Sequence, residues 1–224
     1  MNYTHSEENY LKTIFHLQLE NKTVSTNALA EKLQARPASI TDMMKKLSAK
    51  NLLHYKPYYG FSLSMEGKKV AIDIIRRHRL WEFFLAEKLK FGWDEVHVLA
   101  EELEHVGSKK LIDKLDEYLG FPSFDPHGDP IPDSKGKIRA NTMVPLNEVP
   151  LNQPVKVSRI NNQSSEILEI LNHKAIGIGT QVEVKKRFSF DQSILLKIKS
   201  GTTETFSEQL AKNIMVAYET RNKR

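Results

Sequence analysis

Residues 25–49 read STNALAEKLQARPASITDMMKKLSA, and this stretch decides how the first third of the chain folds. Its opening residues, 25–27, offer N-cap side chains for a short helix over 28–33. The break that follows places Pro37 near the first position of a second helix, which runs over 38–49. Two helices joined by such a tight turn predict a helix-turn-helix unit.

The flanks of this stretch extend the unit on both sides. Apolar residues recur at helical spacing over 8–19 and predict a preceding helix. Residues 52–63, LLHYKPYYGFSL, read as two strand-like runs around a Pro/Gly turn. A helix, a helix-turn-helix and a hairpin in this order are typical of a winged helix-turn-helix, whose second helix enters the major groove of DNA.

Charge supports a polyanionic partner for this region. Residues 1–80 carry 13 basic and 7 acidic side chains, whereas residues 81–119 carry 5 basic and 10 acidic ones. A basic first third favours binding to DNA, and an acidic middle favours cations. The residues predicted to contact bases or phosphates are Arg36, Pro37, Ser39, Thr41, Lys45, Lys46, Lys56 and Tyr58.

The rest of the chain separates into a helical and a strand-rich part. Helical patterns cover 66–90, 94–106 and 108–119, and a loop with four prolines and two glycines follows over 120–132. Beyond residue 144, strand-like alternation over 155–160, 181–186, 194–198 and 214–218 surrounds one short helix, 164–171, and suggests a small barrel. We therefore predict a mainly α chain with domains at 1–64, 65–140 and 141–224.

Composition narrows the chemistry. The chain has 224 residues, is 40% hydrophobic and has no cysteine, so any metal ligands must be nitrogen or oxygen donors. It contains neither an apolar run of about 20 residues, which a membrane span needs, nor a secretory signal. The expectation is a cytoplasmic globular protein without a membrane partner.

Histidine and glutamate concentrate at helical spacing in the acidic middle. Residues 97–105, HVLAEELEH, place His97, Glu101 and His105 four residues apart with Glu104 beside them. In the preceding helix, His78 and Glu82 show the same spacing. Carboxylates and imidazoles converging from two helices predict a site for a divalent transition metal.

Several motifs together resemble the DtxR/MntR metalloregulators. They are RPASITDMMKKL at 36–47, GKK at 67–69, RHRL at 77–80, the pair Glu104-His105, and PHGDPIP at 126–132. The resemblance covers most of the chain and weakens after residue 140. It implies a homodimer whose winged helix binds a palindromic double-stranded operator when metal occupies the helical dimerisation domain, with a small Src-homology-3-like, FeoA-like β-barrel at the C-terminus.

The resemblance also implies two ligand sets. Its primary site corresponds to Glu101, Glu104 and His105 with Asn9 from the first helix, and its second site to His78, Glu82 and His97. The C-terminal domain contributes two further counterparts, Gln163 and Glu166.

Three positions depart from the family pattern. Position 101 is Glu, as in manganese-type members, where iron-type members carry Cys. Asn9 stands where manganese-type members carry Asp and iron-type ones Met, and Lys12 stands where short manganese-type members carry Glu. Glu8 is an alternative ligand from the first helix. Because oxygen donors suit manganese better than soft sulfur does, we predict Mn(II) as the cofactor, with Fe(II) as the alternative.

The resulting hypothesis is a metal-dependent repressor that controls metal-ion uptake genes. A winged-helix regulator that senses an organic ligand is the alternative class. An enzyme is not expected, because the sequence offers no nucleophile–base pair and no His-Glu-x-x-His motif. His127 is interpreted as a residue that stabilises its Pro/Gly turn, and His5, His16, His54 and His173 as structural or surface residues.

Overall fold

A computed structural model describes residues 3–56, 59–106, 108–138, 143–199 and 201–217. The chain forms two compact units: unit 1 comprises residues 1–81, 100–120 and 132–138, and unit 2 comprises 82–99, 121–131 and 139–224. Among the described residues, no helix combines the length and apolar character that crossing a membrane requires.

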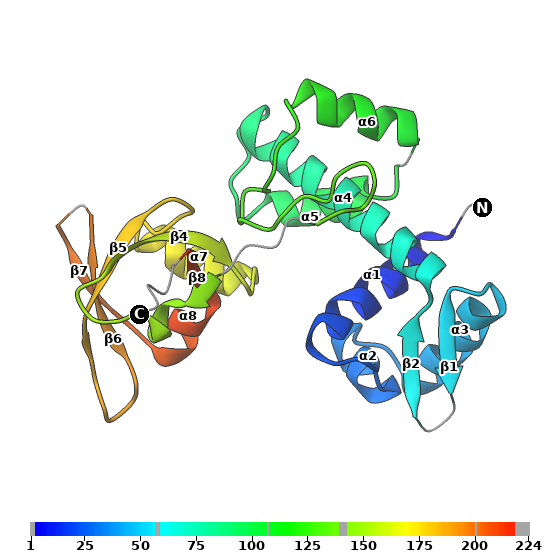
Figure 1. Cartoon of the computed structure of the whole chain (residues 1–224), viewed down its shortest axis with the longest axis horizontal. Helices are drawn as coiled ribbons and strands as arrows, with labels where there is room; N and C mark the ends of the chain where they lie inside the picture. The colour runs from blue at the N-terminus through cyan, green and yellow to red at the C-terminus, as the bar shows by residue number, and fades with distance from the viewer. Residues whose placement is uncertain (1–2, 57–58, 107, 139–142, 200, 218–224) are drawn as a thin grey trace, which may run out of the picture. The chain divides into compact units, whose positions relative to one another are not determined.

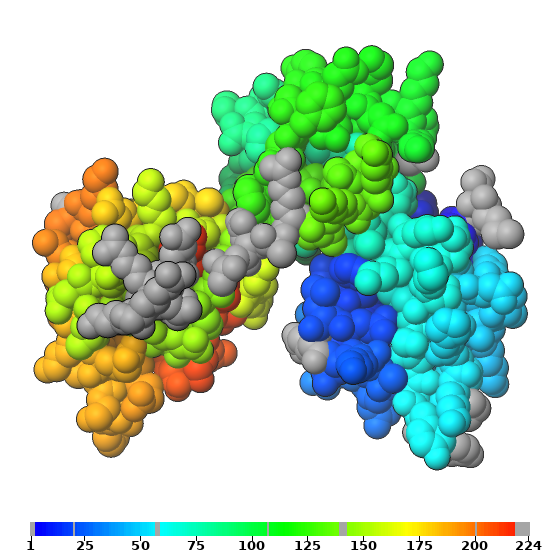
Figure 2. Space-filling model, in the orientation of Figure 1, coloured from blue at the N-terminus to red at the C-terminus, as the bar shows by residue number. Residues whose placement is uncertain are grey.

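Unit 1 begins with the predicted winged helix-turn-helix. Helices α1 (His5–Glu20), α2 (Thr26–Lys32) and α3 (Pro37–Ala49) pack with a hairpin of β1 (Leu53–Lys56) and β2 (Gly60–Leu63), as Figure 1 shows. Their fully buried side chains include Leu11, Leu29, Ile40 and Leu47, which form one apolar core. In the space-filling view these segments, blue to cyan, make one continuous body (Figure 2).

Local capping explains where these helices begin. Helix α1 begins three residues before the predicted start because Thr4 and Glu7 form a capping box that satisfies free N–H groups of the first turn. Helix α2 is capped by Ser25, whose hydroxyl accepts from the Ala28 N–H at 3.1 Å. Pro37 occupies the first turn of α3, where its missing N–H costs nothing.

The hairpin is antiparallel and is held against the preceding loop. Leu53 pairs with Leu63 and Lys56 with Gly60. Gly60 has a φ of +95°, and a Cβ there would lie 2.5 Å from the carbonyl oxygen of Val24, so only glycine fits. Phe61 bridges to Val24 and is buried in the core. The wing tip, which includes the predicted contact Tyr58, lies outside the described residues.

Three helices follow the wing, each shorter than its sequence pattern predicts. Helix α4 covers Met65–Glu87, α5 covers Val96–Leu103 and α6 covers Lys109–Tyr118. Helix α4 ends before Lys90, whose φ of +61° breaks the helix. The hydroxyl of Ser108 caps α6 by accepting from the Leu111 N–H.

Unit 2 contains a six-stranded antiparallel sheet with the strand order β3-β8-β4-β5-β6-β7. The strands are β3 (Met143–Pro145), β4 (Pro154–Ile160), β5 (Gln181–Arg187), β6 (Ile194–Ile198), β7 (Thr203–Phe206) and β8 (Ile214–Ala217). A short 3-10 helix, η1 (Leu146–Glu148), follows β3, and α7 (Ser165–His173) and α8 (Glu208–Asn213) pack on the same core (Figure 1).

The predicted barrel is realised as this sheet, which is not closed among the described strands because β3 and β7 each pair with one neighbour. The sequence analysis missed β3, β7 and α8. Strand β7 reads TETF and has a single apolar residue, so it lacks an alternating pattern. Helix α8 has six residues, which is too short for a helical period to emerge.

Candidate metal centres and nucleic-acid interface

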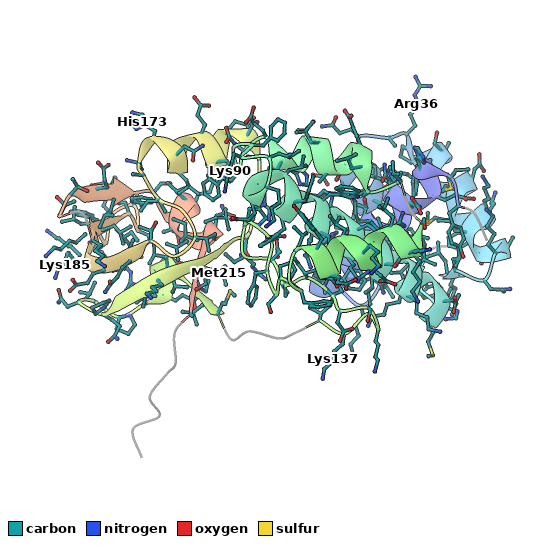
Figure 3. All side chains as sticks on the ribbon, turned by 90° about the horizontal axis from the view of Figure 1, so that it is seen from above. Arg36, Lys90, Lys137, His173, Lys185 and Met215 are labelled. Atoms are coloured by element: carbon teal, nitrogen blue, oxygen red, sulfur yellow. The ribbon has the colours of Figure 1, made fainter. Side chains whose placement is uncertain are left out.

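The predicted DNA-contacting face lies on α3 and the end of β1. Arg36, Pro37, Ser39, Lys45, Lys46 and Lys56 are exposed, and Thr41 is half-buried. The Arg36 side chain makes no capping hydrogen bond and projects outward from the start of α3 (Figure 3). The Thr41 hydroxyl donates to the Pro37 carbonyl at 3.0 Å, and the Lys56 ammonium lies 4.3 Å from the Tyr59 ring centre.

The same helix is tied to α1 through Glu7. Its buried carboxylate accepts from Lys50 at 2.5 Å and lies 3.2 Å from the Lys46 Nζ. Burial raises the pKa of Glu7, but the hydrogen bonds from Lys50, the Thr4 backbone and Lys46 outweigh it and lower the pKa from 4.5 to about 2. Lys46 therefore has an intramolecular partner as well as an exposed position on the predicted DNA face.

A first constellation in unit 1, largely buried apart from Glu101, contains four of the predicted metal ligands. We call it the Glu104 cluster, and it comprises Glu8, Lys12, Arg77, His78, Glu101, Glu104 and His105. Glu104 is fully buried, and its two oxygens lie 2.6 and 2.8 Å from the Lys12 Nζ. The same Nζ lies 2.6 Å from Glu101 Oε1. The ammonium of Lys12 thus joins two of the three acidic and imidazole residues predicted for the primary site.

The remaining members of this cluster satisfy one another. Glu8 accepts from Arg77 at 2.9 Å and from His105 Nδ1 at 2.6 Å, so both of its oxygens have partners. His78, expected in the second site, places Nδ1 2.6 Å from Glu104 Oε2. Burial raises the pKa of Glu104, but the hydrogen bond from His78 and the charge of Lys12 outweigh it and lower that pKa.

This arrangement answers whether a divalent ion fits the predicted primary site. The donor types suit one, since Glu101 and Glu104 offer oxygens and His105 Nε2 lies 3.7 Å from Glu104 Oε1. Asn9 Oδ1 is buried without a hydrogen-bond partner among the described residues. However, the ammonium of Lys12 already occupies the position that bridges the carboxylates. With the ammonium in this position, the predicted primary site of Glu101, Glu104 and His105 does not fit a metal ion.

A second constellation, buried apart from His97, lies in unit 2 and fits a metal ion better. We call it the His127 cluster, and it comprises Glu82, His97, Asp125 and His127. Glu82 is 1% exposed, with Oε1 3.1 Å from His97 Nδ1 and Oε2 3.7 Å from His127 Nδ1. Ligand atoms of Glu82, Asp125 and His127 all lie within 4.8 Å of one another. Two carboxylates and an imidazole at this spacing are a common donor set for divalent ions.

The hydrogen bonds of His127 prepare it as a ligand. Its Nε2 lies 2.7 Å from the carbonyl oxygen of Trp93, which assigns a ring proton to Nε2, so that in the neutral ring the lone pair is on Nδ1. That Nδ1 is buried and has no hydrogen-bond partner among the described residues. Burial lowers the pKa of His127, but Glu82, Asp125 and the Trp93 carbonyl outweigh it and raise the pKa. The carboxylates therefore stabilise a cation at Nδ1, and a metal ion bound there would displace the proton of the imidazolium.

The loop that carries Asp125 and His127 is fixed to the sheet of unit 2. Asp125 Oδ1 accepts from the N–H groups of His127 and Asp129, both at 2.9 Å. The Ile160 N–H donates to the His127 carbonyl at 3.0 Å, and Gly128, with φ +85°, approaches the Ser158 carbonyl so closely that a Cβ would lie 1.9 Å from its oxygen. A rigid backbone therefore holds both side chains in place.

The two predicted ligands from the C-terminal domain have different environments. Gln163 is half-buried, and its amide donates to Asp129 Oδ2 at 2.7 Å. Glu166 is exposed in the first turn of α7. The link through Asp129 brings Gln163 to the loop of the His127 cluster.

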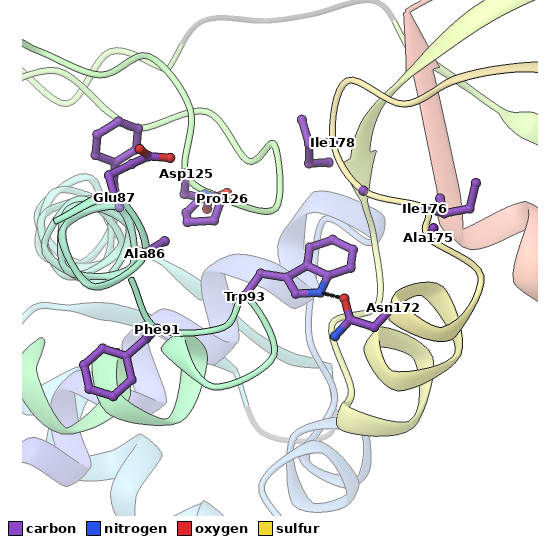
Figure 4. A pocket seen from close by; sticks show the side chains of 12 residues that line it. Ala86, Glu87, Phe91, Trp93, Asp125, Pro126, Asn172, Ala175, Ile176 and Ile178 are labelled. Atoms are coloured by element: carbon purple, nitrogen blue, oxygen red, sulfur yellow. Dashed lines mark hydrogen bonds between the residues drawn. The ribbon is translucent and has the colours of Figure 1, made fainter. Parts of the chain in front are cut away.

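A pocket of about 590 Å³ adjoins this loop within unit 2. Figure 4 shows Trp93 on one side, donating through Nε1 to the Asn172 amide oxygen, with Pro126 and Ile178 on other sides. Asp125 also lines the pocket, which therefore shares a wall with the His127 cluster.

The sequence analysis did not single out Asp125 and interpreted His127 as a residue that stabilises its Pro/Gly turn, a role that its hydrogen bonds with Ile160 and Trp93 allow. The signal that was available is the spacing Asp-Pro-His-Gly-Asp over 125–129, in which two prospective ligands alternate within a proline- and glycine-rich loop. Loop residues follow no helical period, so their convergence with Glu82 could be found only in three dimensions.

Three protein-family models match successive parts of the chain. Residues 2–61 match the N-terminal DNA-binding domain model of iron-dependent repressors, residues 64–133 match their metal-binding and dimerisation domain model, and residues 144–218 match the FeoA domain model.

Individual relatives extend over most of the chain. The iron-dependent repressor IdeR of Mycobacterium bovis is 32% identical over 158 residues, which cover 67% of this chain and 68% of the relative. The regulator MntR of Oceanobacillus iheyensis is 32% identical over 118 residues, 53% of this chain and 80% of the relative. A manganese-dependent transcriptional repressor solved in complex with manganese superposes with a TM-score of 0.86 at 31% identity, covering 95% of this chain and 100% of that one.

Proposed function

We propose that this chain, which belongs to the DtxR/MntR family of metal-dependent DNA-binding repressors and not to a class of enzymes, responds to Mn(II) and controls genes for metal-ion uptake. The observation that carries the proposal is the His127 cluster, where a buried imidazole Nδ1 without a hydrogen-bond partner faces buried carboxylates. Fe(II) is the alternative effector, since the relatives include both iron- and manganese-dependent repressors.

The donor chemistry favours manganese. The chain has no cysteine, so every candidate ligand is an oxygen or an imidazole nitrogen. Manganese binds most weakly among the divalent first-row metals at ordinary sites, and hard oxygen donors favour it relative to softer competitors. We place the sensed ion at Glu82, Asp125 and His127, with His97 beside Glu82 and Glu166 as a further donor from α7. Gln163 is linked to this site through Asp129.

A bound ion would supply positive charge that Glu82 and Asp125 share. The residues of this chain do the rest: Trp93 holds the His127 tautomer, and the 125–129 loop fixes two ligands relative to β4. Metal can shift the repressor towards its DNA-binding arrangement only by binding that arrangement more tightly.

For DNA we propose that α3 enters the major groove. Ser39, Thr41 and Lys45 would reach base edges, and Arg36, Lys46 and Lys56 would contact phosphates. Pro37 begins this helix, and Tyr58 would hydrogen-bond backbone oxygens of the DNA. A homodimer would present two such helices to a palindromic operator.

The test begins with selection of duplexes from random DNA by the full-length protein, in parallel with Mn(II) and with EDTA. Fluorescence anisotropy of the selected duplex then measures affinity with Mn(II), anaerobic Fe(II) or EDTA. We expect Mn(II) to tighten binding by about 10-fold or more. Equal affinity with Mn(II) and with EDTA would reject metal dependence, and a stronger effect of Fe(II) than of Mn(II) would reject manganese as the effector.

A further inference from the structure

Lys12 is the side chain by which the Glu104 cluster differs from the His127 cluster. It lies on α1 and is buried, and its side chain is 11% exposed. Its Nζ contacts three oxygens of two carboxylates, Glu101 and Glu104, at 2.6 to 2.8 Å. These distances are those of strong, charge-assisted hydrogen bonds. The ammonium therefore lies between α1 and the end of α5, where carboxylate oxygens surround it as they would surround a metal ion.

We infer that the ammonium of Lys12 takes the place of a metal ion among Glu101, Glu104 and His105. The contact between α1 and the end of α5 therefore forms without metal. The inference rests on the proposed function in taking the chain to bind a divalent ion at the His127 cluster. It assigns metal sensing to that cluster alone.

Geometry makes the ammonium and a metal ion mutually exclusive. A manganese ion bound to Glu101 Oε1 and Glu104 Oε1 would need both oxygens at roughly 2.1–2.2 Å, typical of divalent metal–oxygen bonds. The Lys12 Nζ already lies 2.6 Å from each of them. Two cations cannot share these oxygens at such separations, so metal entry requires Lys12 to leave both carboxylates.

The rest of the cluster supports the ammonium. The three carboxylates of Glu8, Glu101 and Glu104 face the two permanent cations Lys12 and Arg77. Arg77 also donates to the Glu104 backbone carbonyl at 2.6 Å, which fixes the end of α5 next to α4. Both oxygens of Glu8 accept hydrogen bonds, from Arg77 and His105, so Glu8 would have to give up one of them to bind a metal ion. The charge that a divalent ion would balance is already largely neutralised.

The experiment counts bound Mn(II) by equilibrium dialysis with metal analysis on four full-length proteins: wild type, His127→Ala, Lys12→Glu and the double variant. Removing His127 silences the unit 2 site, so it exposes whatever the Glu104 cluster binds. We expect one ion per chain in the wild type, none in His127→Ala, two in Lys12→Glu and one in the double variant. Lys50→Glu in the His127→Ala background is the matched control, because Lys50 pairs with buried Glu7 outside the cluster, and we expect it to bind none.

Thermal unfolding of the same proteins guards against misfolding. Mn(II) should leave the melting temperature of His127→Ala unchanged and raise that of the double variant, even where Lys12→Glu is unstable without metal. One ion retained by His127→Ala with Lys12 intact would overturn the inference, as would a folded double variant that gains none. A wild type that binds no ion would instead reject the proposed function, whereas the gain in the double variant would still support the role of Lys12.

Discussion

The Glu104 cluster and the His127 cluster are built from the same kinds of side chain but balance their charge differently. In the first, Lys12 and Arg77 supply permanent cations to Glu101, Glu104 and Glu8. In the second, Glu82 faces the imidazoles of His97 and His127, and Nδ1 of His127 has no hydrogen-bond partner among the described residues. The cations of the Glu104 cluster are side chains of the protein itself. The His127 cluster has donor atoms that can bind a cation from solution.

The difference shows why a ligand pattern alone does not define a metal site. Buried carboxylates are stable only when paired or hydrogen-bonded, and an ammonium meets this need as well as a metal does. We therefore propose that the Glu104 cluster, whose charge is already balanced, is a structural contact, and that the His127 cluster is the one that binds metal. Within one chain, a single lysine can separate the two behaviours.

The largest expected effect comes from removing the internal cation. Lys12→Met keeps the length and apolar stem of the side chain but leaves Glu104 buried without its ammonium partner. Breaking a buried pair in this way typically costs about 3–5 kcal/mol. Urea unfolding in EDTA, followed by Trp81 fluorescence in a Trp93→Phe background, reports on unit 1. Lys45→Met, at a side chain 65% exposed, should change the free energy of unfolding by less than about 0.5 kcal/mol. Similar values for both variants would show that the Lys12 contacts contribute nothing to stability.

A second lysine-neutralised carboxylate, Glu7, provides a pH test of the same principle. Its pKa is about 2 in the folded chain against 4.5 ordinarily, so the folded state holds this proton less tightly than the unfolded state does. The stabilisation is therefore complete above pH 4.5 and is lost as the pH falls from 4.5 towards 2, by at most about 3 kcal/mol. Glu7→Gln should remove this part of the acid dependence in urea titrations. An identical pH profile for the two proteins would contradict the ion pairs with Lys46 and Lys50.

Much of unit 1 could be predicted from the sequence because local chemistry determines it. The turn before Pro37, the cap at Ser25 and the period of Ile40, Met44 and Leu47 act over a few residues, and the structure places each as predicted. Helix ends were less accurate, since the capping box at Thr4 and the positive φ at Lys90 override the apolar period.

The sites were only partly predictable, because they depend on contacts between distant segments. The spacing of Glu101, Glu104 and His105 indicated a ligand set, and the departure at Lys12 was visible, but the position of its ammonium was not. Residues 12 and 104 are 92 positions apart. Asp125 and His127 meet Glu82 through a loop, where no periodicity marks which side chains converge.

Metal binding at the His127 cluster should depend on the His127 imidazole. We expect His127→Ala to weaken Mn(II) binding by about 100-fold or more, because losing even a residue that only orients a ligand typically costs about 10–100-fold. Trp93 lies 6.0 Å from the His127 ring, so quenching of its fluorescence in a Trp81→Phe background reports binding at this site. His173→Ala, at an exposed residue of α7, is the matched control and should bind as the wild type does. Equal loss in both variants, or in neither, would place the ion elsewhere.

The smallest expected effect on metal affinity comes from Gln163, which links the C-terminal domain to the His127 cluster. Gln163 donates to Asp129, and the Asp129 N–H donates to Asp125 Oδ1, so Gln163 connects to the cluster through the loop. Gln163→Ala should weaken Mn(II) binding by up to about 10-fold, less than loss of His127. Gln163→Glu separates two roles by the sign of its effect. If Gln163 positions Asp129, a carboxylate can neither donate to it nor tolerate its charge, and affinity falls. If its amide oxygen binds the ion directly, the carboxylate is a stronger ligand and affinity rises. Glu166→Gln, measured by the same fluorescence titration, should lower affinity only if the exposed carboxylate on α7 reaches the metal.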